Sequence, residues 1–328
     1  MKMIKKLFTS AVLIALSASA FALESRFNSA TANTITDEAS YLMNSTEWNK
    51  LNFDKTFVFT SIDSNASGNI AAAFKLKNNA TLMTSWDGNL WSATNKYNNF
   101  AALYGTGKYS FGASFASGTT TVEIPIYGSG SADITEFGLT FGMNVTDKDD
   151  ITAAFGYISS DDFGDDSIIT LTGGYKRNLT KTSNASIIYT GIFFNDITTN
   201  TLVPAYHYEY NNKKVSYGFT ATAPVTFASI YGTSVTMFTP VINNGVSLNL
   251  SDSFSLNAGL STTLPYIAKT EGMDATYGNF LNTFTFGFSI NAGSAVKIDA
   301  SSVFNLASGV SIDDILTTPF MLSVSMKF

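Results

Sequence analysis

The only histidine of the chain, His207, stands near a carboxylate, so this pair is the first candidate for catalytic chemistry. In the run Tyr206-His207-Tyr208-Glu209-Tyr210, the tyrosines alternate with His207 and Glu209. In an extended strand His207 and Glu209 share one face, and a carboxylate can orient an imidazole as a general base. Serine is too common in the sequence for a matching nucleophile to stand out. We therefore expect no enzyme, and we assign His207 and Glu209 to a polar interior.

An acidic cluster, Asp161-Asp162-Phe163-Gly164-Asp165-Asp166, is the best candidate for metal binding. Calcium sites need several oxygen ligands at ordered spacing, and this run does not match the twelve-residue calcium loop. The chain has no cysteine, which excludes disulfides, thiol catalysis and thiolate metal sites. No glycine-rich phosphate loop stands out. We expect neither a metal nor a cofactor, and we assign the cluster to a solvated loop.

The composition is unusual for a soluble domain. Charged residues make up 13% of the 328 residues and aromatic residues 14%, whereas a soluble domain has about 25% charged residues. The net charge is −6, or −9 (16 basic against 25 acidic residues) without Lys2, Lys5 and Lys6, and no basic patch indicates a nucleic-acid partner. Beyond residue 22 no run of 18 apolar residues occurs. A closed β-barrel is then the structure that satisfies the backbone in lipid.

The first 22 residues have the pattern of a signal peptide. Three lysines precede an apolar core from Leu7 to Leu16, and Ala20-Phe21-Ala22 fits a small-x-small cleavage site. We expect residues 1–22 to be removed during export and the mature chain to begin at Leu23.

Beyond residue 52, apolar and polar residues alternate in segments of about ten residues, the length of a tilted transmembrane strand. One side of each segment is rich in Phe, and the other is rich in Ser, Thr, Gly and Asn. The clearest segments are 107–116, 135–145, 253–261 and 283–291. The sequence therefore predicts an all-β fold, a transmembrane antiparallel β-barrel over residues 53–328.

The connections between these segments sort into short turns and longer loops, as in outer-membrane barrels. We predict about 14 strands, within a range of 12 to 18, because single-chain bacterial barrels use even strand numbers. The stretches 224–231 and 234–242 are open to interpretation as a separate hairpin. Pro204 and Pro224 interrupt strand-like stretches, so we place both near strand ends.

The last strand carries a family resemblance. Five apolar residues share one of its faces, and the chain ends on an aromatic residue: Phe320, Leu322, Val324, Met326 and Phe328. This pattern resembles the C-terminal signal of bacterial outer-membrane β-barrels. The resemblance implies a location in the bacterial outer membrane. It also implies two partners, membrane lipid and the machinery that assembles outer-membrane barrels.

Residues 23–52 break the alternation, and Thr36-Asp37-Glu38 could start a helix. We expect this segment to form a short helical plug or hatch at the barrel. The run from Asp37 to Ser45, followed by Trp48 and Leu51, is similar to the start of the long-chain fatty-acid transporter family. Asn44-Ser45-Thr46-Glu47 replaces the Asn-Pro-Ala-Gly motif of that family. The resemblance implies a plugged barrel that passes hydrophobic compounds, with Leu42, Met43 and Trp48 as candidates for plug or ligand contacts.

Three functions stay open. A porin-like channel would pass small-molecule solutes through a lumen of Ser, Thr, Asn and Gly. Candidate lumen charges are Lys75, Lys77, Lys108, Glu136, His207, Glu209 and Lys327, and residues 117–133 would form a constriction loop. The first alternative is the plugged channel for hydrophobic compounds. The second is a surface-displayed adhesin or antigen that makes contact through residues 127–133 and 268–279.

Overall fold

The structure is a computed structural model that describes residues 30–32, 34–35, 56–62, 67–77, 80–89, 96–124, 128–160, 167–305 and 321–327. No helix within these ranges has the length and hydropathy needed to cross a membrane. The predicted signal peptide, the predicted helix from Thr36, and the acidic cluster at 161–166 lie outside the described residues. So do Leu42, Met43, Trp48, Phe320 and Phe328.

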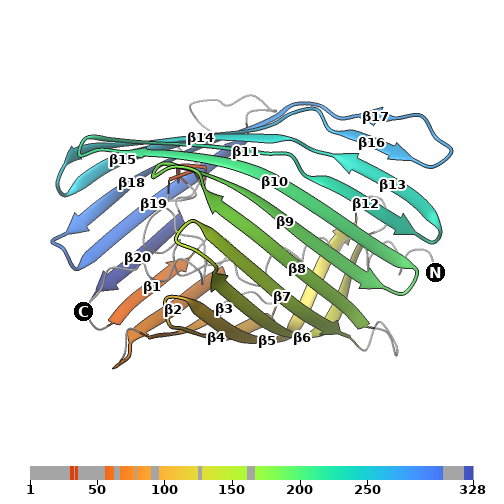
Figure 1. Cartoon of the computed structure of the whole chain (residues 1–328), viewed down its shortest axis with the longest axis horizontal. Coiled ribbons are helices and arrows are strands. Elements are labelled where there is room, and N and C mark those ends of the chain that lie inside the picture. The colour runs from red at the N-terminus through yellow and green to blue at the C-terminus, as the bar shows by residue number, and fades with distance from the viewer. Residues whose placement is uncertain are drawn as a thin grey trace.

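The described residues form twenty β-segments that join in one antiparallel sheet (Figure 1). The bounds are β1 Thr56–Ile62, β2 Ser67–Lys75, β3 Thr81–Asn89, β4 Lys96–Gly105, β5 Tyr109–Ile124, β6 Gly128–Asn144, β7 Asp149–Ser159, β8 Ser167–Asn178, β9 Ser183–Phe194, β10 Ile197–Asn211, β11 Val215–Thr222, β12 Val225–Ile230, β13 Thr233–Phe238, β14 Val241–Ser251, β15 Phe254–Thr263, β16 Ile267–Thr270, β17 Thr276–Tyr277, β18 Leu281–Ala292, β19 Val296–Asn305 and β20 Met321–Lys327.

The sheet closes because β1 pairs with β20, from Phe57 opposite Lys327 to Ile62 opposite Leu322. Four pairs of segments continue one another across a break: β11 with β12, β13 with β14, β15 with β16, and β17 with β18. For example, β10 pairs with β12 through one half and with β11 through the other. Twenty segments minus four continuations give sixteen strands. The predicted antiparallel barrel is confirmed, and the predicted number of 14 strands is wrong.

A row of prolines accounts for three of the breaks. Pro224, Pro240 and Pro265 follow β11, β13 and β15, and Pro204 lies on the neighbouring β10. Along the row, the N–H of Ala223 donates to Pro204 O, that of Thr239 to Pro224 O, and that of Leu264 to Pro240 O, at 3.1, 3.1 and 2.9 Å. The reciprocal bond of each pair is missing because proline has no N–H.

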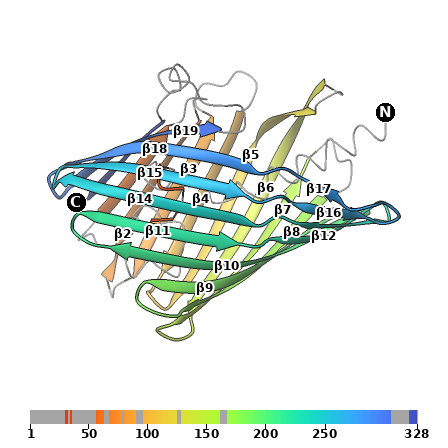
Figure 2. The ribbon, with the colours of Figure 1, turned by 90° about the horizontal axis from the view of Figure 1, so that it is seen from above.

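The row of prolines also settles two expectations from the sequence. Pro224 lies at a strand end, as predicted. Pro204 lies inside β10, so its predicted place near a strand end is wrong. The strand tolerates this proline because the adjacent strand breaks at the same level, between β11 and β12. The stretches 224–231 and 234–242 are not a separate hairpin. They contain β12 and β13, which lie with β16 and β17 at one end of the barrel (Figures 1 and 2).

Side chains alternate between the two faces of the wall. On β5, Phe111 and Phe115 are 55% and 51% exposed, while Ser110 and Ser114 on the other face are buried. The same alternation puts Phe137 and Leu139 of β6 on the exposed face and Glu136 on the buried one. A wall that presents large apolar side chains outward and buries small polar ones inward is suited to lipid outside and a lumen inside.

The two ends of the barrel differ in their connections. One end, called the turn end here, has short turns at 76–80, 106–108, 145–148, 179–182, 212–214, 252–253 and 293–295, and β20 ends there. A constriction loop was predicted at residues 117–133; its described residues, 117–124 and 128–133, instead extend the β5–β6 hairpin at the opposite end as far as Ile124 opposite Gly128. Within residues 268–279, the described structure is the β16–β17 hairpin.

Two adjacent substitutions in β8 test the assignment of the faces. Leu171 is 43% exposed on the outer face, and Thr172 faces the lumen. We expect Leu171→Arg to destabilise the barrel in the membrane by about 2–4 kcal/mol, because a lipid-facing arginine at mid-membrane lacks water. Thr172→Arg should cost much less. Heat-modifiable gel migration of membrane fractions measures the folded share; equal losses for both variants would contradict the assignment.

Candidate functional site: the lumen and the segment inside it

A groove of glycines runs across the lumen wall formed by β11, β14, β15 and β18. Gly218 is paired with Gly245, Gly245 with Gly259, and Gly287 follows two residues after Thr285, the partner of Gly259. All four lie on the lumen-facing side of their strands. A side chain at any of them would project into the lumen, so the absence of a Cβ leaves a shallow channel along the wall.

The described residues 30–32 and 34–35 of the N-terminal segment, written below as residues 30–35, lie in this groove. A Cβ built on Gly245 would lie 2.2 Å from Thr31 O, and one on Gly218 would lie 2.1 Å from Thr34 O. A Cβ on Gly259 would lie 2.4 Å from Ala32 N. These distances are far shorter than any real contact, so backbone of the segment lies directly against backbone of the wall.

Hydrogen bonds and burial fix the segment in place. Thr285 Oγ1 donates to Ala30 O at 3.0 Å, and Thr34 Oγ1 donates to Thr31 O at 2.6 Å. Ala30, Thr31 and Thr34 are fully buried. Ala32 has a φ of 50°, a left-handed conformation that costs a non-glycine residue about 1–2 kcal/mol. The contacts with the groove therefore offset a local strain.

The lumen face of β1 to β4 carries an apolar patch beside polar side chains, which include Ser61, Asn69, Thr81 and Asn99. The patch includes Phe57 and Phe59, which pair with Ala73 and Ala71 of β2. All four are at most 1% exposed. Met83 of β3 and Leu103 of β4 continue the surface, paired with each other and both buried. A lumen of Ser, Thr, Asn and Gly was predicted. Ser61, Asn69 and Asn99 agree with this prediction, whereas the apolar patch differs from it.

Further apolar side chains face the lumen away from the turn end. On β6, β7 and β8, Ile134, Ile158 and Ile168 alternate with outward-facing residues and are at most 2% exposed. Elsewhere the apolar lining is accessible: Ile188 of β9 and Val303 of β19 are 41% and 39% exposed. Ile188 pairs with Gly174, and Gly174 pairs with the lumen-facing Thr152. Residues paired across strands share a face of the sheet, so Ile188 also faces the lumen.

A band of threonines supplies the polar part of the lining. Thr172 and Thr190 face each other between β8 and β9, with their hydroxyl oxygens 3.4 Å apart. Thr201 and Thr226 do the same between β10 and β12, at 3.0 Å. These side chains are half-buried. Hydroxyl groups of this kind can bind a polar solute or water without carrying charge.

Three contacts between ionisable side chains lie in the lumen near the turn end, each within one wall, while Glu136 and Asp87 face the lumen farther from that end. Lys176 Nζ lies 3.6 Å from Asp150, Lys297 Nζ lies 3.2 Å from Asp299, and His207 Nε2 lies 3.5 Å from Glu209. Each lysine of these pairs is offset by a carboxylate of the same wall, so the lumen pairs themselves favour weak ion selectivity.

The histidine makes a second contact that the sequence did not predict. His207 Nδ1 and Thr220 Oγ1 are 2.9 Å apart across the β10–β11 pair, and Asn211 Nδ2 donates to Glu209 Oε1 at 2.6 Å. A hydroxyl, an imidazole and a carboxylate thus lie in a row. His207 and Thr220 belong to strands paired on both sides, so their backbone N–H groups serve the sheet ladder rather than an oxyanion. The contacts support a role in joining β10 to β11.

The predicted lumen residues divide into two groups. Glu136, His207 and Glu209 face the lumen, and Lys75 and Lys327 lie on lumen-facing positions at the strand ends. Lys77 and Lys108 lie in turns and are exposed, so they are not part of the lumen wall. Among the described residues no group of three or more His, Cys, Asp and Glu could hold a metal ion.

The comparisons with known proteins identify the fold. No protein-family model matches the chain, and no curated protein sequence matches it. A bacterial polysaccharide outer-membrane secretin is similar in structure over 83% of this chain and 97% of its own, with a TM-score of 0.52 and 8% identity. CdiB from Escherichia coli is similar in structure over 83% of this chain and 62% of its own, with a TM-score of 0.55 and 11% identity. BamA from Haemophilus ducreyi, in a form lacking POTRA domains 1–3, gives 0.50 at 9% identity, over 84% of this chain and 70% of that one. The chain therefore has the fold of bacterial outer-membrane β-barrels.

A larger side chain in the groove tests whether residues 30–35 are held there. We expect Gly245→Leu to displace the segment, because its side chain would need the space of Thr31 and Thr34. The chain has no cysteine, so Ala32→Cys provides a unique label for a thiol-reactive dye. Labelling of the folded barrel should be slow in Ala32→Cys alone and at least about tenfold faster when Gly245→Leu is added.

Gly173→Leu is the matched control. Gly173 lies on the outer face of β8 and a Cβ there would meet nothing within 4 Å. This control should leave the labelling rate unchanged. Rapid labelling of Ala32→Cys without the groove substitution would show that the segment is not held.

Proposed function

We propose that this outer-membrane barrel is a channel that passes small hydrophobic molecules, and that residues 30–35 belong to an obstruction inside its lumen. The observation that carries the proposal is the apolar lining. Phe57, Phe59, Met83 and Leu103 face inward on one wall, and accessible Ile188 and Val303 extend the lining on others. Apolar side chains that face the interior of a membrane barrel serve neither lipid contact nor an aqueous pore.

The obstruction supports a selective channel rather than a wide pore. In a wide aqueous pore the lumen-facing side chains would be hydrated, yet Phe57, Phe59, Ala71 and Ala73 are at most 1% exposed. On the other wall, the groove is filled by residues 30–35. A solute that passes must follow the remaining surface, where Ile188 and Val303 are accessible.

The energetics favour an apolar solute on such a surface. Each square ångström of apolar surface removed from water contributes about 25 cal/mol, so covering about 100 Å² contributes roughly 2.5 kcal/mol. A value of this size concentrates a solute in the lumen and still allows it to leave. The lysine–aspartate pairs on the lumen wall add little attraction for ions.

The threonine band favours a second candidate, porin-like passage of small uncharged polar solutes. Thr172, Thr190, Thr201 and Thr226 offer hydroxyl groups on the lumen side of β8 to β12. Such a path would let water and small polar molecules pass beside the segment. The two candidates differ in current, because a hydrated path conducts ions and an apolar path does not.

Conductance and uptake together test the channel. Reconstituted in a planar bilayer, the full barrel should show little steady current, and removal of residues 30–35 should raise the current at least about tenfold. Liposomes that contain the intact barrel should take up a small apolar fluorescent dye faster than empty liposomes. A large steady current from the intact barrel, with no effect on the dye, would favour the porin-like candidate.

Substitution of an accessible lining residue tests the route. We expect Ile188→Gln to reduce dye uptake several-fold, since an amide that must be desolvated by the solute replaces an apolar contact, and Ile188→Leu to keep it. Both variants should fold equally well, as heat-modifiable migration can establish. Equal uptake by both variants would place the hydrophobic route elsewhere.

A further inference from the structure

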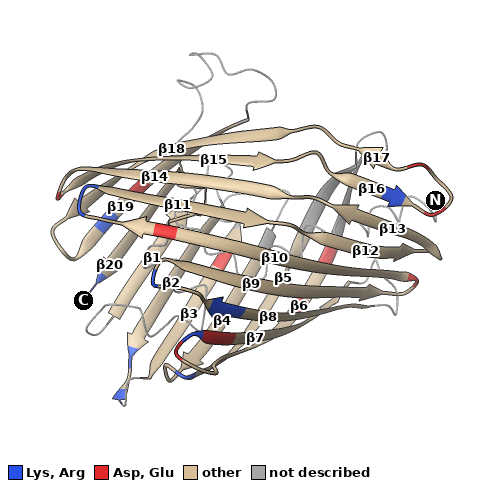
Figure 3. Ribbon diagram, turned by 45° about the horizontal axis from the view of Figure 1, so that its top comes forward, with Lys and Arg blue, Asp and Glu red and all other residues tan. Residues whose placement is uncertain are grey.

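The turns at the turn end are basic. Within their described residues they contain six lysines, all exposed: Lys77, Lys108, Lys148, Lys181, Lys213 and Lys214. Only two acidic residues, Asp147 and Asp252, lie in the same turns. Figure 3 shows basic residues at the tips of the hairpins around this end of the barrel. The excess is unexpected in a chain with a net charge of −6.

The opposite end has the reverse balance. Its described connections at 195–196, 231–232 and 271–275 contain three acidic residues, Asp196, Glu271 and Asp274, and neither lysine nor arginine. Burial and the charge of Asp196 raise the pKa of the Tyr231 hydroxyl in the neighbouring turn. The barrel is thus polarised along its axis, with positive charge at the turn end.

Tyrosines on the outer face lie directly beside the basic turns. Tyr109, Tyr175, Tyr210 and Tyr217 are 38–46% exposed and lie within four residues of a turn. Lys108 Nζ lies 5.4 Å from the centre of the Tyr109 ring, so this lysine follows the outer face of the barrel. Outward tyrosines of this kind mark the boundary between hydrocarbon and lipid headgroups. The lysines therefore lie at headgroup level.

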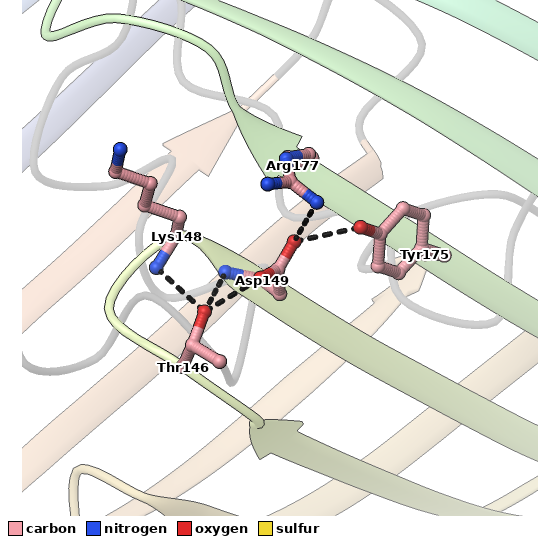
Figure 4. Close-up of polar contacts among 5 residues, drawn as sticks. All are labelled: Thr146, Lys148, Asp149, Tyr175 and Arg177. Atoms are coloured by element: carbon pink, nitrogen blue, oxygen red, sulfur yellow. Dashed lines mark hydrogen bonds and ion pairs between the residues drawn. The ribbon is translucent and has the colours of Figure 1, made fainter.

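The β6–β7 and β8–β9 turns form the best-defined part of this rim. Asp149 accepts hydrogen bonds from Thr146 and from the Tyr175 hydroxyl, both at 2.6 Å, and lies 3.5 Å from Arg177 (Figure 4). The Arg177 side chain is 56% exposed on the outer face. Lys148 lies in the first of these turns, and its carbonyl accepts a hydrogen bond from Asn178 at 2.8 Å. Asp149 thus orients the rim but offsets one of its several positive charges.

We propose that the turn end of this barrel selectively binds anionic phospholipid headgroups through the lysines of its turns. Phosphate groups complement the charge, and the outer-face position of Lys108 and Arg177 fits lipid that surrounds the barrel. The turns at 145–148, 179–182 and 212–214 follow one another along the rim, so several headgroups can bind side by side rather than one in a pocket. Each charge near an anionic surface raises binding by about fivefold, and salt weakens the effect.

Lipid composition around the purified barrel tests the proposal. The barrel is reconstituted in nanodiscs of phosphatidylcholine with a minor share of phosphatidylglycerol. It is then extracted in mild detergent, and its retained lipids are quantified by mass spectrometry. We expect phosphatidylglycerol to be enriched several-fold over its bulk share at low salt, and less at high salt. Replacing Lys148, Lys181, Lys213 and Lys214 by Gln should return the ratio to the bulk value.

Two control variants isolate the rim. Replacing the same four lysines by Arg should keep the enrichment, and Lys269→Gln, in β16 at the opposite end, should leave it unchanged. No enrichment in the unchanged barrel, or equal enrichment in the fourfold Gln variant, would overturn the proposal. Co-sedimentation with isolated peptidoglycan that is lost in the fourfold Gln variant, without lipid enrichment, would also overturn it and would assign the rim to the cell wall.

Discussion

Every feature of this barrel depends on the need to pair backbone N–H and C=O groups where no water is present. In lipid an unpaired peptide group costs several kcal/mol, so the sheet must have no free edge. The pairing of β1 with β20 removes the edge. Closure then divides each strand into an outer and an inner face, because successive side chains point to opposite sides. The sequence has to supply two different surfaces at a period of two residues, and its alternation of Phe with Ser, Thr and Gly does so.

The same constraint explains where the wall can be interrupted. A proline removes one ladder bond, and a single interruption inside a sheet would leave a neighbouring carbonyl without its donor. Here Pro204, Pro224, Pro240 and Pro265 lie on adjacent strands, so the breaks share one line. Three carbonyls on this line still accept a hydrogen bond from the next strand. Concentrating the missing bonds in a row lets β12, β13, β16 and β17 continue the barrel beyond the line.

A feature of this barrel could be predicted from the sequence when it depends on neighbouring residues, and could not when it depends on residues far apart in the chain. Alternation is local, so the barrel and the outer positions of Phe111, Phe115 and Phe137 could be predicted. The strand number could not, because some strands alternate too weakly to be recognised, as β4 does with Ala101, Ala102 and Leu103 in succession, while a proline break such as that between β11 and β12 adds an apparent strand end. The interior was harder still. The alternation assigns Phe57 and Phe59 to one face, but it does not say which face is inside when both carry apolar residues.

The glycine groove shows the limit most clearly. Gly218, Gly245, Gly259 and Gly287 lie far apart in sequence and come together because four strands align in register. A glycine on the polar side of a strand predicts a thin wall, but not what lies against it. The four glycines can be recognised as one groove only when the strand register is known. A hint was present in the small residues Ala30, Thr31, Ala32 and Thr34, which are short enough for backbone to approach backbone.

The distribution of charge follows from the same separation of environments. A charged group in the hydrocarbon layer is costly, so the few charges in the described part of the chain lie in turns, at strand ends or inside the lumen. Inside, Lys176 with Asp150 and Lys297 with Asp299 are paired, because the lumen is too enclosed to hydrate a lone charge fully. Outside, at the turns, water and headgroups can solvate lysine freely, so pairing is not required there. The unpaired excess of positive charge can therefore collect at that rim alone, where it acts on the surrounding lipid without affecting the apolar path through the lumen.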